Sequence, residues 1–178
     1  MEDISHHILD IAENSLQGAA SRVEISIVRD RKKNLLCIEV TDDGRGMDPI
    51  TLARVRDPFF TTKEKRTGLG IPFLAQAAEQ AGGVLIVNSA PCSGTRVAAT
   101  FKWDHIDRPA IGSMTDTVMT LLIGHPEIDI VYEEQDGKRV FRFDTGELKR
   151  ELEGVPINAP ETLSAIRALF KKNVKFEM

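Results

Sequence analysis

The sequence predicts an α+β protein, a two-layer α/β sandwich in which one mixed, mostly antiparallel sheet carries helices on one face. Two observations lead to this fold class. Segments with alternating apolar residues come in hairpin pairs, and amphipathic segments with helical spacing stand before and between those pairs. A doubly wound sheet does not fit, because it would need strands and helices to alternate singly.

The first hundred residues are predicted to run as helix, two strands, helix, loop, helix and two strands. Ile4, Ile8 and Ile11 recur at helical spacing in the first of these helices. The other elements are strands at 22–29 and 35–40, a glycine-rich turn at 42–49, a short helix near 49–55, a charged loop at 57–70, a helix at 71–81 and strands at 84–89 and 95–103.

A connector at 104–112 precedes a smaller α+β segment. It is predicted to hold a helix at 114–124, a hairpin that turns at Asp136 and Gly137, and a helix at 161–172. We therefore divide the chain into a domain at 1–104 and a small C-terminal extension at 105–178. An extension of about 70 residues is near the lower limit for independent folding, so we expect it to pack on the first domain or on a second copy, as in a homodimer.

Composition is that of a globular protein, with 42% hydrophobic and 28% charged residues. No apolar run is long enough to cross a membrane and the N-terminus lacks a signal-peptide pattern, so a cytoplasmic protein is expected. The net charge of -4 gives no reason to expect nucleic-acid binding. Cys37 and Cys92 are far apart and form no metal-binding pair.

Four polar motifs are unusual when taken together. Asp10 and Asn14 lie four apart in the first helix, where better helix formers would be expected on a solvated face. DDGRGM follows the second strand, RTGLG precedes the helix at 71–81, and SGT precedes the last strand of the first domain. Each motif alone reads as a turn, a loop or a solvated face, but their order and spacing are hard to explain as accident.

The runs ENSLQGAASRVEISI and IEVTDDGRGMD resemble the ATPase domain of the GHKL superfamily, and most closely its MutL and gyrase branch. The later runs, DPFFTTK, RTGLGIPFLAQAAEQAGG and SGTRVAATF, are more similar to the ATP-binding domain of sensor histidine kinases. The resemblance covers about residues 4–103. It implies the Bergerat ATP-binding fold, with ATP and Mg²⁺ as cofactors.

On this resemblance, Asn14 is the Mg²⁺ ligand and Asp10 occupies the position of the base that activates water. An amide oxygen suits Mg²⁺, which keeps most of its waters and takes few protein ligands. The family's usual base is glutamate, and Asp10 reaches one methylene less far, so hydrolysis is an open question. Glu13 is a weaker candidate, because it lies about 100° around the helix from Asn14.

The resemblance also assigns the nucleotide-binding residues. Asp42 would accept a hydrogen bond from the exocyclic amine of adenine and so disfavour guanine. Gly44 and Gly46 would let the backbone approach the ring, and Met47 would pack beneath the ring. The remaining assignments are Thr95 to complete the adenine pocket, and Lys63, Thr67, Gly68, Leu69 and Gly70 to contact the phosphates from the lid and from the start of the next helix.

Three functions remain open at this point. The first is a stand-alone protein kinase of the anti-sigma-factor type, without a phosphoacceptor-histidine domain, because the chain begins only a few residues before the first motif. The others are a slow ATPase switch of the MutL or gyrase type and a nucleotide sensor without turnover. His6 and His7 are expected to be polar helix residues rather than phosphoacceptors.

The overall layout also resembles small proteins associated with iron-hydrogenase systems, which implies a redox-linked protein partner. Cys37 and Cys92 would then be candidate redox-sensitive thiols. The simpler interpretation is that Cys37 is a small hydrophobic residue in a strand and that Cys92 lies in a loop beside the adenine pocket.

Overall fold

Six strands form one mixed sheet in the order β3-β4-β2-β1-β5-β6. The structure, a computed structural model, describes residues 3–57 and 70–174. The strands are β1 (Arg22–Asp30), β2 (Leu35–Asp42), β3 (Leu85–Ser89), β4 (Thr95–Lys102), β5 (Asp129–Asp136) and β6 (Arg139–Asp144). β1 and β5 are parallel, and the other four neighbouring pairs are antiparallel.

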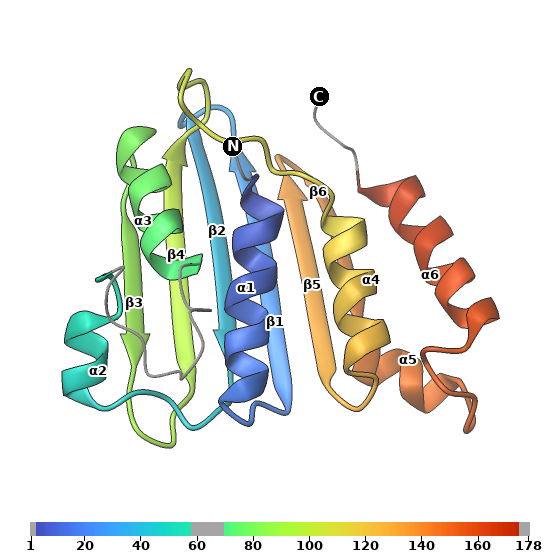
Figure 1. Cartoon of the computed structure of the whole chain (residues 1–178). Coiled ribbons are helices and arrows are strands. Elements are labelled where there is room, and N and C mark those ends of the chain that lie inside the picture. The colour runs from blue at the N-terminus through green and yellow to red at the C-terminus, as the bar shows by residue number, and fades with distance from the viewer. Residues whose placement is uncertain (1–2, 58–69, 175–178) are drawn as a thin grey trace.

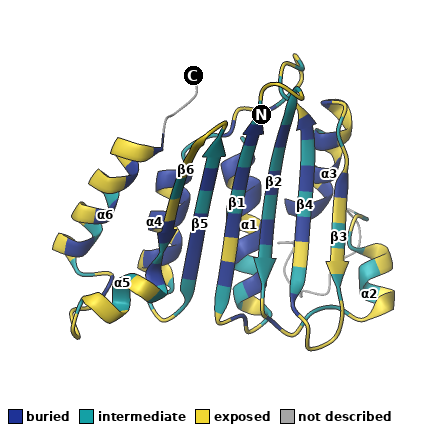
Figure 2. Cartoon of the chain, turned by 180° about the vertical axis from the view of Figure 1, so that it is seen from behind, coloured by how far each residue is buried: buried dark blue, intermediate teal, exposed yellow. Residues whose placement is uncertain are grey.

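Three helices lie side by side over one face of this sheet (Figure 1). They are α1 (Ile4–Gln17), α3 (Gly70–Gln80) and α4 (Met114–Gly124). α6 (Pro160–Asn173) packs outside α4, while the short helices α2 (Pro49–Arg54) and α5 (Thr145–Glu151) lie at the ends of strands. On the opposite face, shown in Figure 2, buried residues alternate along the strands with exposed and intermediate ones. The predicted α+β sandwich with a mostly antiparallel sheet is thus confirmed.

α1 forms because its ends are capped and one of its faces is apolar. The carboxylate of Asp3 accepts a hydrogen bond from the His6 amide at the N-terminus, and Gly18 ends the helix. Ile4 and Ile8 are fully buried, and Ile11 is nearly so. Burial of each such side chain stabilises the fold by roughly 1.5–3 kcal/mol.

The C-terminal segment continues the sheet of the first hundred residues. β5 pairs with β1 along eight residues, and the amides of Ile4 and Ser5 donate to the carbonyls of Ala110 and Ile111. The predicted hairpin forms β5 and β6, and the predicted final helix is α6. The short helix α5 was not predicted from the sequence. The division of the chain at residue 104 stays a prediction, because a shared sheet does not decide whether either part folds alone.

Within the described residues, no helix is both long enough and apolar enough to cross a bilayer.

Candidate nucleotide-binding site

Asp42, at the end of β2, accepts hydrogen bonds from three separate segments. Its Oδ1 accepts from the Gly44 amide at 2.9 Å and from the Thr95 amide at 3.2 Å. Its Oδ2 accepts from the Ser15 hydroxyl of α1 at 2.6 Å. A carboxylate offers about four acceptor positions, so these bonds fix the group and leave one position on Oδ2.

Ser89, at the end of β3, joins the glycine-rich turn to the start of β4. Its hydroxyl accepts from the Met47 amide at 2.8 Å, lies 2.9 Å from the Thr95 hydroxyl and donates to the Gly94 carbonyl at 2.9 Å. Met47 and Thr95, both predicted from sequence to contact adenine, are therefore held by one side chain.

Two glycines in this region have backbone conformations that a side chain would strain. Gly46 has φ +66°, and a Cβ there would lie 1.9 Å from the Ala90 carbonyl oxygen. Gly94 has φ +70°, and a Cβ would lie 1.9 Å from the Asp42 carbonyl oxygen. At Gly44, a Cβ would lie 2.8 Å from the Gly18 oxygen. At all three positions the nearest atoms belong to the protein backbone. Glycine is therefore needed for packing of backbone against backbone, whereas the sequence predicted glycine at 44 and 46 for close approach to the adenine ring.

Asp10 lies against the start of α3. A Cβ placed on Gly70, the first residue of α3, would stand 2.7 Å from the Asp10 Cβ and 3.3 Å from its Oδ2. Asp10 is exposed and Asn14, one turn later, is half-buried. Amides at a helix start favour anions, so Asp10 stands where the resemblance puts the phosphates.

Glu13, the weaker candidate for the base, lies toward α4. Its Oε2 is 3.4 Å from Nε2 of His125, the residue that caps the C-terminus of α4. Because Asp10 contacts the start of α3 and Glu13 pairs with the end of α4, the geometry favours Asp10 for a role beside phosphate.

Part of the predicted site lies outside the described residues. Lys63, Thr67, Gly68 and Leu69 belong to it, so the lid contacts stay predictions. Among the described residues, contacts run from Gly70 to Asp10 and, farther along α1, from Ser15 to Asp42 and on to Thr95. Eight predicted residues thus belong to segments that meet, namely Asp10, Asn14, Asp42, Gly44, Gly46, Met47, Gly70 and Thr95.

Ser15 and Ser89 were not predicted to belong to the site. Ser15 is 6% exposed and faces Asp42, although it follows Asn14 directly in the sequence. The sequence feature that pointed to Ser15 was its position on the same helical turn as Asn14. Ser89 ends a strand of alternating residues, and only its pairing opposite Thr95 reveals its role.

A second carboxylate anchors the turn from its other side. The Asp43 carboxylate accepts from the Ser21 hydroxyl and from the amides of Ser21 and Arg22. Burial alone would raise the pKa of Asp43, but these hydrogen bonds lower it below its ordinary value. The start of β1 is thereby tied to the end of β2, next to Asp42.

The histidines near the first helix have structural environments. The His6 ring contacts the Asp3 carboxylate at 2.7 Å, and His7 is 4% exposed within the helix layer. These environments agree with the expectation that both are helix residues.

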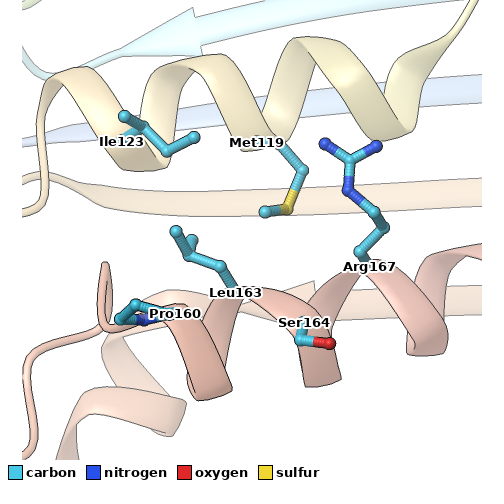
Figure 3. Close-up of a pocket in the computed structure, with 6 residues that line it drawn as sticks. All are labelled: Met119, Ile123, Pro160, Leu163, Ser164 and Arg167. Carbon is cyan, nitrogen blue, oxygen red and sulfur yellow. The ribbon is translucent and has the colours of Figure 1, made fainter.

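A groove of about 380 Å³ lies between α4 and α6, away from the residues above (Figure 3). In the close-up, Met119 of α4 and Leu163 of α6 point toward one another, and Arg167 reaches from α6 toward α4. The lining residues are Met119, Ile123, Pro160, Leu163, Ser164 and Arg167. None of them belongs to the candidate nucleotide site.

These contacts form a candidate nucleotide-binding site, and comparison with known proteins identifies the family of the chain. Residues 2–105 match the family model "Histidine kinase-, DNA gyrase B-, and HSP90-like ATPase". The chain belongs to this family, which supports ATP binding and a histidine kinase-like function.

Curated relatives match about half of the chain. The sensor protein kinase FleS of Pseudomonas aeruginosa is 38% identical over 88 residues, which are 49% of this chain and 22% of that protein. Sporulation kinase A of Bacillus subtilis is 30% identical over 93 residues, 52% of this chain and 15% of that protein. The sensor histidine kinase DcuS of Escherichia coli is 31% identical over 97 residues, which are 53% of this chain and 18% of that protein. The chain thus matches about a fifth of these relatives' length.

A solved structure extends the likeness in fold. The N-terminal domain of a DNA repair protein superposes with a TM-score of 0.55 at 14% identity, over 80% of this chain and 52% of that one. Residues 2–105 are only 104 of the 178, so this correspondence includes part of the C-terminal segment.

Proposed function

We propose that this protein binds Mg-ATP and transfers the γ-phosphoryl group to a separate protein in a signalling pathway. The observation that carries the proposal is the Asp42 carboxylate, held by three donors with one acceptor position left on Oδ2. The sensor kinases among the relatives support a kinase.

The described residues suit a purine nucleotide. Asp42 would accept from the exocyclic amine, with Thr95 and Met47 beside it. Asn14 would contribute an amide oxygen to Mg²⁺, which supplies charge neutralisation at the β- and γ-phosphates. The start of α3 at Gly70 would present backbone amides toward phosphate, together with residues of the predicted lid, Lys63, Thr67, Gly68 and Leu69.

Phosphoryl transfer requires little covalent chemistry from the protein. A side-chain oxygen or nitrogen of the acceptor protein forms a bond to the γ-phosphorus while the bond to the β,γ-bridging oxygen breaks, and ADP leaves. The proton of the acceptor passes to a nearby base or to water. Positioning of the two reactants provides most of the catalysis.

A slow ATPase switch is the second candidate, and the position of Asp10 against Gly70 favours it. In this case Asp10 would take a proton from water as the water oxygen attacks the γ-phosphorus, the bond to the β,γ-bridging oxygen breaks, and ADP and inorganic phosphate are released. A nucleotide sensor without turnover would keep the adenine contacts and need no base.

One experiment separates these functions. The purified protein is incubated with Mg²⁺ and γ-labelled ATP, alone and with cell extract, and both free phosphate and protein-bound label are followed. Label on another protein supports the kinase. Free phosphate that disappears in Asp10→Asn, but persists in the control Glu13→Gln, supports the ATPase. Binding without either product supports the sensor.

The binding claim has its own test. We expect Asn14→Ala to weaken Mg-ATP binding while leaving Mg-free nucleotide binding nearly unchanged, as measured by titration calorimetry with and without a chelator. No ATP binding by the unaltered protein, or unchanged Mg-ATP affinity in Asn14→Ala, would show the proposal to be wrong. A redox-linked partner, a homodimer and a cytoplasmic location stay predictions.

A further inference from the structure

We propose that Ser15 is a positioning residue that sets adenine selectivity, by holding the one oxygen of Asp42 that reads the exocyclic amine. The inference rests on the proposed binding of ATP at Asp42. It adds a residue outside the predicted site, and it ties base recognition to the helix that carries Asn14.

The two oxygens of Asp42 are held differently. Oδ1 accepts from the Gly44 and Thr95 amides, so both of its acceptor positions are used. Among residues 3–57 and 70–174, Oδ2 accepts only from the Ser15 hydroxyl, at 2.6 Å. The position left for an amine donor is therefore on Oδ2.

The hydroxyl of Ser15 has one proton and two acceptors within reach. The carbonyl oxygen of Ile11, one turn earlier, is 3.2 Å away, and Asp42 Oδ2 is closer. Hydrogen bonds to ionised groups are the shorter and stronger ones, so the proton is directed to Asp42. Ser15 is 6% exposed, so water does not compete freely for this bond.

Without the hydroxyl, Oδ2 accepts from no donor among the described residues, and the carboxylate can rotate about the two hydrogen bonds that Oδ1 accepts. The amine of adenine would then meet a less well oriented acceptor. A purine without the amine makes no such bond, so it would lose little. Ser15 is thereby distinguished from a residue that supports only the fold.

Ser5 provides a matched control. It lies on the same helix, is 5% exposed, and its hydroxyl also donates to an aspartate, Asp3 Oδ1, at 2.6 Å. Ser5→Ala removes an equivalent, partly buried hydrogen bond at the other end of α1. Alanine is a better helix former than serine, so both variants should keep the helix.

The test measures dissociation constants for ATP and for purine riboside triphosphate, which has hydrogen in place of the amine, with the unaltered protein, Ser15→Ala and Ser5→Ala. We expect Ser15→Ala to bind ATP about tenfold more weakly and to bind the purine analogue within about twofold of the unaltered protein. Ser5→Ala should leave the ratio of the two constants unchanged. In an Asp42→Asn background, Ser15→Ala should not change the ratio further.

The outcomes separate this inference from the proposed function. If the unaltered protein does not bind ATP, the proposed function fails and the role of Ser15 fails with it. If the unaltered protein binds ATP, but Ser15→Ala weakens the binding of ATP and of the purine analogue equally or leaves both unchanged, the role of Ser15 is refuted and ATP binding stands.

Discussion

A buried charge cluster between β1 and β5 allows a quantitative test of how the two parts of the chain depend on each other. Arg29 of β1 forms an ion pair with Glu134 of β5, and the Tyr132 hydroxyl donates to the second oxygen of that carboxylate at 2.6 Å. Arg29 is 4% exposed, Glu134 is 7% exposed and Tyr132 is fully buried. Burial, and then the carboxylate beside it, raise the pKa of Tyr132 well above the ordinary value for tyrosine, so the phenol remains a donor.

The perturbation is Glu134→Gln, which keeps the side-chain shape and removes the charge. Arg29 then loses its buried ion pair with Glu134, and breaking a buried pair by removing one of the two charges typically costs about 3–5 kcal/mol. At about 2–4 °C per kcal/mol for a chain of this size, Tm should fall by about 6–20 °C. Tyr132→Phe removes only a hydrogen bond to a charged group, so it should cost about 1.5–3 kcal/mol.

The assay is urea unfolding followed by circular dichroism, with two further variants. Glu133→Gln is the matched control, because this neighbouring glutamate is only half-buried and its side chain lies on the other face of β5. Replacement of both ion-pair partners by Met and Leu should recover most of the lost stability. A Glu134→Gln loss below about 1 kcal/mol, or equal to that of Glu133→Gln, would refute the inference that a buried charge pair joins β1 to β5.

Three further predictions concern the candidate site and its surroundings. Gly94→Ala should lower stability and ATP affinity far more than Gly137→Ala in unfolding and binding titrations, because both glycines have positive φ but only a Cβ at Gly94 meets backbone, at 1.9 Å. In timed alkylation with mass spectrometry, exposed Cys92 should react well before Cys37, whose thiol pKa is raised by burial and then by nearby carboxylates; equal rates would contradict this. The Asp43 carboxylate has a lowered pKa, so its stabilising contribution is present above the unfolded pKa of about 4 and is lost as pH falls through the folded value. The stability difference between the unaltered protein and Asp43→Asn should therefore shrink between about pH 7 and pH 3, and a constant difference would contradict the assignment.

The local elements of the fold could be predicted because their signals are local. The alternation in β1 and β2 and the turn at Asp136 and Gly137 follow from residues close together in sequence. The parallel pairing of β5 with β1 could not be predicted in this way. It joins residues about 105 positions apart, as Arg29 and Glu134 do, and no pattern within either strand specifies that partner.

The candidate site shows the same limit at the level of side chains. Asn14, Asp42 and the glycines carry recognisable motifs, so they could be identified by resemblance. Ser15 could not, because its role depends on the distance between α1 and the end of β2. The reason for glycine at positions 46 and 94 was also hidden, since the carbonyls that exclude a side chain belong to other segments.

The contact between Asp10 and Gly70 changes how the shorter side chain of Asp10 should be understood. Compared with glutamate, aspartate reaches about 1.5 Å less far, the length of one carbon–carbon bond. Gly70 has no side chain, and a Cβ there would stand 2.7 Å from the Asp10 Cβ, so α3 begins closer to α1 than any other residue would permit. The close approach places Asp10 beside the start of α3, where the resemblance puts the phosphates. A shorter acid opposite a glycine is therefore compatible with a water-activating role, and the substitution of aspartate for glutamate alone does not argue against hydrolysis.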